Sequence, residues 1–484
     1  MDAQSAQQDR GTVKKKRDLV VIGGGPGGLI VASFAAQVGL RVTLIEKSDR
    51  LGGDCLHSGC VPSKTLIHMA RTAHIARRGA ATGLLSVMPD IDYGKVIDRV
   101  EQVVDRIQQH DDPERFRSYG CEVRFGTARF ISPHEVTVDE DVISGRRFVI
   151  ATGSMPAIPP IPLLEQTGFE TNETIFKRRV LPDHLAVIGG GPVGVELAQA
   201  FSRLGSRVTL IEAADRLLLH EDEQTSLLLQ QALEEEGIHI MTATQVAGVR
   251  REGDDARQIA LADGRTVECD RILIATGRRP VVHGLGLEEA GVEFGRQGIG
   301  VDRRLRTSQK HIYAVGDVCG PYQFTHMAEY QAGIALANIV FRTPKKTDYR
   351  VVPRVVYTDP EVASVGLTEA EAKKKGIKYH TAEFEMAGID RAITDGHEQG
   401  RARLLISRGR IAGASIVGPH AGELIHELAL AMQVDTKVKD IAAMIHAYPT
   451  YAQIHRRTIN TSYAHLMQSK KVRMLVWMLN RLLP

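Results

Sequence analysis

A glycine-rich pattern between an apolar strand and a helix occurs twice in this chain, and it constrains the fold more than any other feature. Residues 18–46 are DLVVIGGGPGGLIVASFAAQVGLRVTLIE, and residues 184–212 are HLAVIGGGPVGVELAQAFSRLGSRVTLIE. Each copy predicts a buried strand, a tight turn, a helix and a second strand that ends on an acid. We therefore expect an α/β fold with two doubly wound dinucleotide-binding domains.

The physics of a dinucleotide site fits each position of the first copy. Gly23 permits the tight turn, Gly25 lets the backbone approach a pyrophosphate, and Gly28 allows the helix to pack closely on the strand. The start of the helix then presents unpaired N–H groups to the phosphates. Glu46 stands where an acid accepts hydrogen bonds from ribose hydroxyls.

The second copy keeps the same internal spacing, so the chain is expected to bind two dinucleotides. The equivalent candidates are Gly189, Gly191, Gly194 and Glu212. Three further apolar strands end in small-residue turns: FVIATGSMP (148–156), ILIATGRRP (272–280) and HIYAVGDV (311–318). Asp317 ends one of them, where a ligand crevice in an open sheet is expected. Turn residues complete the cofactor candidates: Gly126, Thr152, Gly153 and Gly277.

Composition excludes several classes of protein. The chain has 484 residues, enough for two to four domains, and a net charge of +3 without a basic, aromatic-rich stripe that would favour nucleic acid. The first residues lack the apolar core of a signal peptide, and no apolar run reaches the length of about 18 residues that a membrane span needs. We expect a cytoplasmic protein whose thiols are kept reduced.

Two of the five cysteines lie close together in GGDCLHSGCVPSK (52–64). Cys55 and Cys60 are compatible with half of a metal site, a structural disulfide, buried packing or a redox pair. Zinc would need two more ligands, and only His57 and His68 are nearby in sequence, so no metal site is predicted. The other three cysteines have no partner in sequence and are expected to pack in the interior.

Together these motifs, in this order, resemble the class I pyridine nucleotide–disulfide oxidoreductases, such as dihydrolipoamide dehydrogenase, glutathione reductase and mercuric reductase. The resemblance covers residues 18–465 and includes VVPRVVYTDPEVASVGLTEAEA (351–372). It implies FAD at the first glycine motif and at Asp317, NADH or NADPH at the second motif, and a homodimer. Glu212 would repel a 2′-phosphate, although Arg216 partly compensates, so NADH is the expected donor.

The resemblance also assigns roles at the cysteine pair. Cys60 would be the thiol that faces the flavin, and Cys55 the exposed interchange thiol that attacks the substrate. A helix N-terminus would favour thiolate character at both. Lys64 would lie near the flavin and pair with Glu196.

The sequence departs from its disulfide-reducing relatives in MIHAYPTYAQIH (444–455). Where those relatives carry a proton-transferring histidine and, five positions later, a glutamate, this chain has Tyr448 and Gln453. Tyrosine, with an ordinary pKa near 10, is a poor base at neutral pH. His446 and His455 are expected to be ordinary polar positions.

Three functions therefore stay open. The first is a mercuric reductase-like oxidoreductase that passes electrons from NAD(P)H through FAD and Cys55–Cys60 to a disulfide, quinone or metal ion. However, no cysteine follows Cys319, whereas mercuric reductases carry a pair near the C-terminus. The second is a dihydrolipoamide dehydrogenase, and the third is a redox-sensing flavoprotein with little turnover.

The motifs also predict the division of the chain. In order these are a disordered lead-in (1–17), an FAD domain (18–155), an NAD(P) domain (156–280), a continuation of the FAD domain (281–350), an α+β dimerisation domain (351–465) and a basic amphipathic segment (466–484). The last segment predicts an amphipathic helix. The simpler interpretation is that it docks on the partner subunit, and the alternative is that it lies on the anionic inner face of a membrane.

Overall fold

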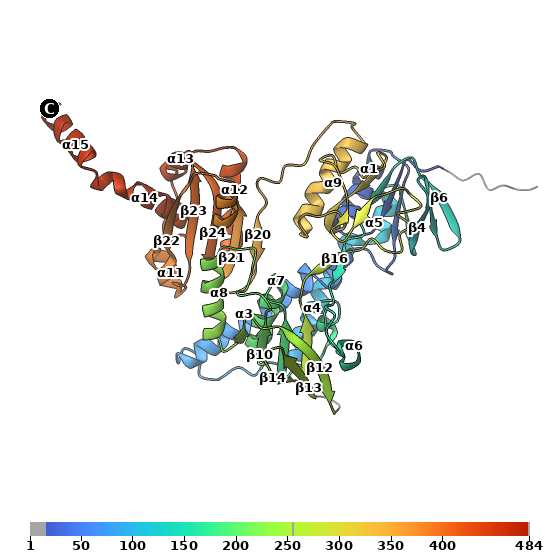
Figure 1. Cartoon of the computed structure of the whole chain (residues 1–484), viewed down its shortest axis with the longest axis horizontal. Helices are drawn as coiled ribbons and strands as arrows, with labels where there is room; N and C mark the ends of the chain where they lie inside the picture. Colours follow the sequence, from blue (N-terminus) through green and yellow to red (C-terminus); the bar gives the residue numbers. More distant parts are fainter. Residues whose placement is uncertain (1–15, 254–255, 483–484) are drawn as a thin grey trace, which may run out of the picture. The chain divides into compact units, whose positions relative to one another are not determined.

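The structure is a computed structural model, and it describes residues 16–253 and 256–482. Most of the predicted lead-in lies outside these residues. The chain forms two compact units, each assembled from separate stretches (Figure 1). The first unit comprises the chain up to Pro62, Arg99–Ala157 and Arg278–Thr347; the second comprises Ser63–Asp98, Ile158–Gly277 and the chain from Asp348.

The first unit is built on a parallel five-stranded sheet in the order β19-β7-β1-β2-β3. The strands are β1 (Leu19–Ile22), β2 (Val42–Glu46), β3 (Cys121–Phe125), β7 (Phe148–Ile150) and β19 (Ile312–Ala314). All four residues of β1 are buried, as expected for a parallel strand that is covered on both faces.

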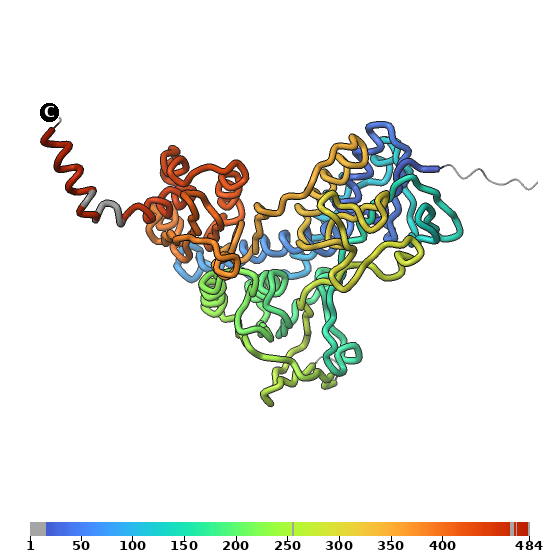
Figure 2. The backbone as a smooth tube through the Cα atoms, turned by 45° about the horizontal axis from the view of Figure 1, so that its top comes forward, coloured from blue at the N-terminus to red at the C-terminus, as the bar shows by residue number. Residues whose placement is uncertain are grey.

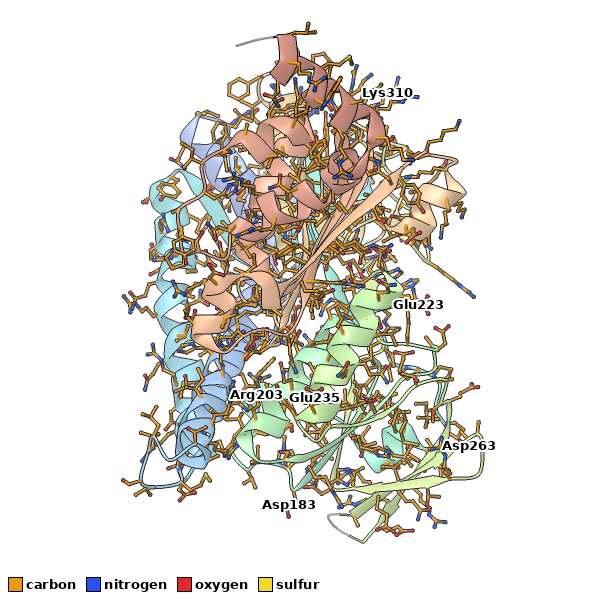
Figure 3. All side chains as sticks on the ribbon, turned by 90° about the vertical axis from the view of Figure 1, so that its left-hand side faces the viewer. Asp183, Arg203, Glu223, Glu235, Asp263 and Lys310 are labelled. Atoms are coloured by element: carbon orange, nitrogen blue, oxygen red, sulfur yellow. The ribbon has the colours of Figure 1, made fainter. Side chains whose placement is uncertain are left out.

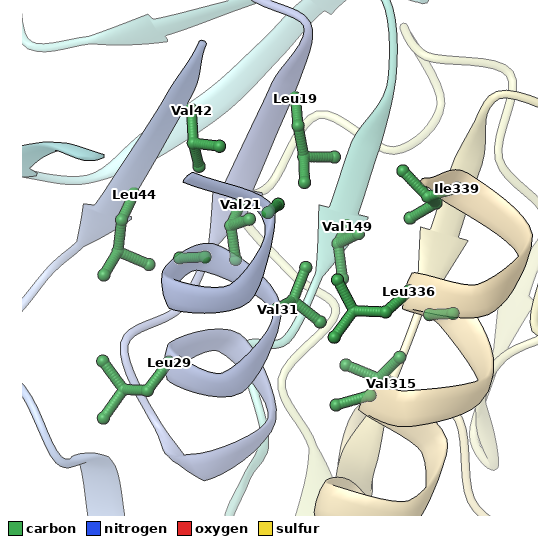
Figure 4. Close-up of a cluster of buried hydrophobic side chains, with 14 of the residues drawn as sticks. Leu19, Val21, Leu29, Val31, Val42, Leu44, Val149, Val315, Leu336 and Ile339 are labelled. Atoms are coloured by element: carbon green, nitrogen blue, oxygen red, sulfur yellow. The ribbon is translucent and has the colours of Figure 1, made fainter. Parts of the chain in front are cut away.

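Alternate residues of β1 enter different cores. Leu19 and Val21 pack against helices α1 (Pro26–Gln37) and α9 (Thr325–Ile339), as Figure 4 shows. Val20 and Ile22 face the other side, where the antiparallel sheet of β4 (Ala128–Ser132), β5 (Glu135–Val138) and β6 (Asp141–Ser144) contributes Phe130 and Val136. This sandwich fixes the turn that follows β1.

The second unit contains a second parallel sheet in the order β11-β10-β9-β15. Its strands are β9 (His184–Ile188), β10 (Arg207–Ile211), β11 (His239–Met241) and β15 (Arg271–Ile274). Helix α7 (Pro192–Leu204) follows β9, and the antiparallel sheet of β12 (Val246–Glu252), β13 (Ala256–Leu261) and β14 (Thr266–Cys269) shares its core. The duplicated sequence thus folds into duplicated structure.

The second unit also contains an antiparallel sheet in the order β20-β21-β24-β23-β22. Its strands are β20 (Arg354–Val356), β21 (Glu361–Gly366), β22 (His380–Glu385), β23 (Arg401–Ser407) and β24 (Arg410–Gly418). Helices α12 (Ala421–Gln433), α13 (Val438–Ala443) and α14 (Gln453–Gln468) share its core. The predicted fold class, two doubly wound regions followed by an α+β region, is confirmed.

Helix α15 (Lys470–Leu482) follows α14 and lies at the end of the described chain (Figure 2). Among the described residues, no helix has the length and apolar character that crossing a bilayer requires.

Candidate active site

The first glycine turn leaves no room for a side chain at Gly23 or Gly28. Gly23 has φ +107°, and a Cβ at Gly28 would lie 1.9 Å from the carbonyl oxygen of Gly23. Gly25 precedes α1 in extended conformation, and its own Cβ would meet little, the nearest atom being 3.9 Å away. No side chain among the described residues caps the start of α1. The first amides of this helix therefore suit an anionic group such as a pyrophosphate.

The carboxylate of Glu46 is held in place at the end of β2. One oxygen accepts a hydrogen bond from the backbone N–H of Gly24 at 2.6 Å, and the other accepts one from Ser48 at 2.8 Å. The backbone N–H of Gly126 donates to the Glu46 carbonyl at 2.8 Å. The acid is thus fixed beside the glycine turn, where it can still accept hydrogen bonds through its remaining lone pairs.

The second glycine turn repeats this geometry. Gly189 has φ +115°, a Cβ at Gly194 would lie 1.8 Å from the Gly189 carbonyl oxygen, and the space beside Gly191 is open. The carboxylate of Glu212 accepts hydrogen bonds from the N–H groups of Gly190 at 2.5 Å and Ala214 at 2.7 Å. The predicted candidate Gly277 has φ +113° and also borders open space.

The two cysteines lie at consecutive helix starts in the first unit. Cys55 is half-buried in α2 (Gly53–His57), and Cys60 is exposed as the first residue of α3 (Cys60–Ala81). Cys55 is thus the less exposed of the two, contrary to the exposed interchange thiol that the resemblance implies. Both are free thiols. The hydroxyl of Thr325, the first residue of α9, lies 3.3 Å from each sulfur. One hydroxyl therefore bridges the pair.

The surroundings of Cys55 do not favour the thiolate that the sequence predicts there. A hydrogen bond with Cys60, together with burial, raises the pKa of Cys55, and the hydroxyl of Thr325 only partly opposes this. The neighbouring thiol and burial therefore outweigh the helix N-terminus, which by itself would lower the pKa of a thiol.

One arginine connects the cysteine turn to the predicted cofactor acid. The guanidinium of Arg278 contacts the Asp54 carboxylate at 2.9 Å and donates to the Ser154 hydroxyl at 2.7 Å. Ser154 in turn donates to Asp317 at 2.5 Å. Burial raises the pKa of Asp317, and the nearby Ser154 and Arg278 offset this.

The neighbouring turn is fixed by backbone contacts. The hydroxyl of Thr152 donates to the Val281 carbonyl at 2.8 Å, and the Val281 N–H donates to the carbonyl of Gly153 at 3.0 Å. The first unit thus brings together the first glycine turn, Glu46, the cysteine pair and Asp317. These residues fit FAD, because an uncapped helix start, a fixed acid and a redox-active sulfur pair match its phosphates, ribose and flavin.

A partly buried ion pair lies in the second unit. The Lys64 ammonium donates to the carboxylate of Glu196, on α7, at 2.8 Å, and the other Glu196 oxygen accepts from the Tyr357 N–H at 2.9 Å. The Glu196 side chain is only 6% exposed. The ammonium also lies 4.4 Å from the centre of the Tyr357 ring. Three contacts therefore fix the position of the Lys64 charge.

The same helix is anchored one turn later. Arg203, labelled in Figure 3, is buried and forms ion pairs with Glu236 and, at 2.9 Å, with Asp359. The side chain of Gln199 exchanges two hydrogen bonds with the Asp359 backbone, at 2.6 and 2.8 Å. These contacts hold the segment that carries Tyr357 against α7.

Tyr448 is 69% exposed, and a hydrogen bond with Asp390 raises its pKa above the ordinary value. The sequence predicts ordinary polar positions at His446 and His455. Their side chains are almost fully buried, and their Nε2 atoms lie 3.1 and 3.8 Å from the two oxygens of Glu427. Burial lowers the pKa of His455 to about 4, so its imidazole is neutral at physiological pH.

Sequence reasoning missed Thr325, Arg278 and Glu427. The strand-and-turn pattern around Arg278 was a usable signal, since it follows a predicted cofactor turn, whereas nothing local marks Thr325 or Glu427. Among the described residues, no group of three or more His, Cys, Asp or Glu side chains is arranged to hold a metal ion.

Comparison with known proteins places these features in a family. The model of the pyridine nucleotide-disulphide oxidoreductases matches residues 17–332, and that of their dimerisation domain matches residues 352–458. A dihydrolipoyl dehydrogenase of Thermus scotoductus is 37% identical over 91% of this chain and 96% of its own length. A mercuric reductase of Bacillus cereus is 33% identical over 90% of this chain and 70% of its own length.

A solved structure has the same fold. The Cu(II) complex of the HOCl-induced flavoprotein disulfide reductase RclA from Escherichia coli superposes with a TM-score of 0.84 at 29% identity, covering 92% of this chain and 99% of that one. Such enzymes use FAD and a pyridine nucleotide, and the matched dimerisation domain supports a homodimer. The chain is therefore an FAD-dependent enzyme that belongs to the pyridine nucleotide-disulphide oxidoreductase family.

Proposed function

We propose that this enzyme carries electrons from NADH to an acceptor whose reduction needs little proton transfer, either a metal ion, a quinone or a reactive disulfide. The observation that carries the proposal is the complete cysteine site beside an altered proton-transfer position. Relatives named for mercury and for copper support a metal-ion acceptor, since the former is a mercuric reductase and the latter a Cu(II) complex. The proposed division into domains is that predicted from the sequence.

The residues of the chain would act in a fixed order. The bound flavin supplies a two-electron relay between the nicotinamide and the sulfur pair. Each electron pair breaks the Cys55–Cys60 disulfide, and the reduced sulfurs pass the pair to the acceptor and close the disulfide again. The Thr325 hydroxyl would hold both sulfurs in register. The Lys64 ammonium would attract negative charge that develops at the flavin, and Glu196 would keep it in position.

The role proposed for Cys60, the thiol that faces the flavin, follows from the family resemblance and can be tested by spectroscopy. In the reduced enzyme, a thiolate against a flavin gives a long-wavelength charge-transfer band. We expect this band on titration of the wild-type enzyme with NADH or dithionite. It should be absent from Cys60→Ser and retained by Cys55→Ser, because only the latter keeps the sulfur at the flavin. A band that persists in Cys60→Ser, with FAD bound, would refute the assignment.

The donor preference follows from the surroundings of Glu212. Its negative charge lies beside the second glycine turn and would repel a 2′-phosphate. The guanidinium of Arg216, the cation expected to compensate in part, donates instead to the carbonyl oxygens of Leu219 at 3.0 Å and Glu221 at 3.4 Å. We expect kcat/KM for NADH to exceed that for NADPH by about 100-fold.

The ratio of kcat/KM for NADH to that for NADPH should decrease in Glu212→Ala. It should stay unchanged in Glu234→Ala, which removes a carboxylate on the exposed side of α8 (Glu223–Glu235). Steady-state kinetics with both donors, using one acceptor, provides the measurement. A wild-type enzyme that uses NADPH as well as NADH would contradict this proposal.

Dihydrolipoamide dehydrogenase activity is the second candidate, because a relative with this name is the more similar of the two curated proteins above. An acceptor screen with NADH would separate the candidates. It should include lipoamide, glutathione disulfide, Hg(II), Cu(II) and quinones. We propose that the enzyme works in the cytoplasm, where buried thiols such as Cys121 and Cys269 stay reduced.

A further inference from the structure

Helix α15 exposes a continuous run of large apolar side chains. Every side chain from Arg473 to Leu482 is exposed. Trp477 is 55% exposed and Leu482 77%, and the list of exposed apolar residues in this helix also includes Met474, Leu475, Val476, Met478 and Leu479. Exposed apolar patches of this kind are typical of surfaces that bind another protein or a membrane.

The helix is amphipathic. At 3.6 residues per turn, one face carries Val472, Leu475, Val476, Leu479 and Leu482. The opposite face carries the cations Lys470, Arg473 and Arg481. The guanidinium of Arg481 lies 4.3 Å from the centre of the Trp477 ring, so the indole lies on the cationic face beside this arginine. Tryptophan and arginine side chains at headgroup level are typical of helices that lie in a membrane interface.

All charged Asp, Glu, Lys and Arg residues in the sequence that surrounds this helix are cationic. From Ile441 to Pro484 the sequence contains no Asp or Glu. The same stretch contains six cations: Arg456, Arg457, Lys470, Lys471, Arg473 and Arg481. A cationic helix without nearby acids complements an anionic surface, to which each Lys or Arg adds about fivefold in affinity.

The position and length of the helix narrow the choice of surface. The family's dimerisation domain matches residues 352–458, so α15 lies beyond the segment that the family uses for dimerisation. Its 13 residues give a length of about 20 Å, too short for the roughly 30 Å of a bilayer core. A helix of this length and charge is suited to lie along a membrane surface and is too short to cross it.

We propose that α15 binds the surface of an anionic phospholipid membrane. Its apolar face would enter the boundary between headgroups and acyl chains, while Lys470, Arg473 and Arg481 would contact lipid phosphates. This inference does not depend on the proposed electron acceptor. It reverses the simpler interpretation of the sequence, a helix docked on the partner subunit.

Trp477 is the only tryptophan of the chain, so its fluorescence reports on this helix alone. The full-length holoenzyme would be mixed with vesicles of phosphatidylcholine, with or without one third phosphatidylglycerol. With the anionic vesicles we expect a blue shift of the emission and co-sedimentation of the enzyme, both weakened by 0.5 M salt. With pure phosphatidylcholine we expect neither.

Two variants test the two faces of the helix. Arg473→Gln/Arg481→Gln should weaken binding to the anionic vesicles by roughly 10- to 30-fold. Leu475→Asp/Leu479→Asp should abolish it. Matched controls make the same changes elsewhere on exposed positions: Lys374→Gln/Lys375→Gln, and Leu84→Asp/Val87→Asp. Both controls should bind like the wild type, and all four variants should keep NADH oxidation with a soluble acceptor.

Three outcomes would overturn the proposal. The first is an emission spectrum that anionic vesicles do not change. The second is equal binding to both kinds of vesicle, and the third is binding that survives Leu475→Asp/Leu479→Asp. A blue-shifted emission without vesicles that reverts on dilution would show that a second copy of the chain covers the helix instead.

Discussion

Introducing a histidine and a glutamate, in Tyr448→His/Gln453→Glu, is expected to raise dihydrolipoamide turnover by about 100-fold. The wild type should be slow with this substrate, because the exposed Tyr448 has a pKa above the ordinary tyrosine value and cannot take a thiol proton at neutral pH. A positioned acid–base group typically raises the rate by about 100- to 10,000-fold. The measurement is the NAD-linked oxidation of dihydrolipoamide in steady state.

The pH dependence identifies the cause of the gain. A histidine base accepts a proton only when its imidazole is neutral, so the added rate should grow as pH rises through about 6.5, its ordinary pKa. Tyr448→Asn/Gln453→Glu is the matched control and should show no gain. Buried His446 is not expected to substitute, since its Nε2 contacts Glu427 at 3.1 Å. High wild-type activity with dihydrolipoamide would contradict the proposed acceptor class.

A single methyl group at Gly28 should prevent FAD from being retained. The added Cβ would lie 1.9 Å from the Gly23 carbonyl oxygen, which the turn cannot move without losing its shape. We expect Gly28→Ala to cost about 3 kcal/mol or more in unfolding free energy and to yield colourless protein. Flavin absorbance after gel filtration, together with thermal unfolding, measures both effects.

The second glycine turn provides a contrast. In Gly194→Ala the added Cβ would lie 1.8 Å from the Gly189 carbonyl oxygen, so this variant should lose NADH binding while it keeps its flavin. Gly333→Ala is the control, because a Cβ there meets nothing within 4 Å and the position lies within α9. It should be as stable as the wild type or slightly more so. A Gly28→Ala protein that stays yellow would contradict the assignment of FAD to the first motif.

The sequence could predict the glycine turns because their physics is local. The contact between Gly28 and the Gly23 carbonyl involves residues five positions apart, so the required residue types appear within one short motif. The parallel sheets followed from the same units. Neighbouring residues of β1, such as Leu19 and Val20, enter different cores on the two faces of the sheet. A strand that is buried on both faces needs an unbroken run of apolar residues, which the sequence shows.

The contacts at the cysteines could not be predicted in this way. Thr325 is 270 positions from Cys55, and Arg278 is drawn toward Asp54 only when the first unit is assembled from three stretches of chain. The burial of His446 against Glu427 likewise depends on how α12 packs. Local pattern carries no information about which distant side chain completes a site.

The contacts of Arg278 have a consequence for any attempt to redesign this enzyme. One guanidinium holds both the turn that carries the reactive sulfur and, through Ser154, the acid proposed to bind the cofactor. A substitution of Arg278 is therefore expected to change both the reactivity of the thiol and the binding of the cofactor. A change that improves one will disturb the other, so engineers should leave Arg278 intact and vary the acceptor through the exposed loop around Tyr448.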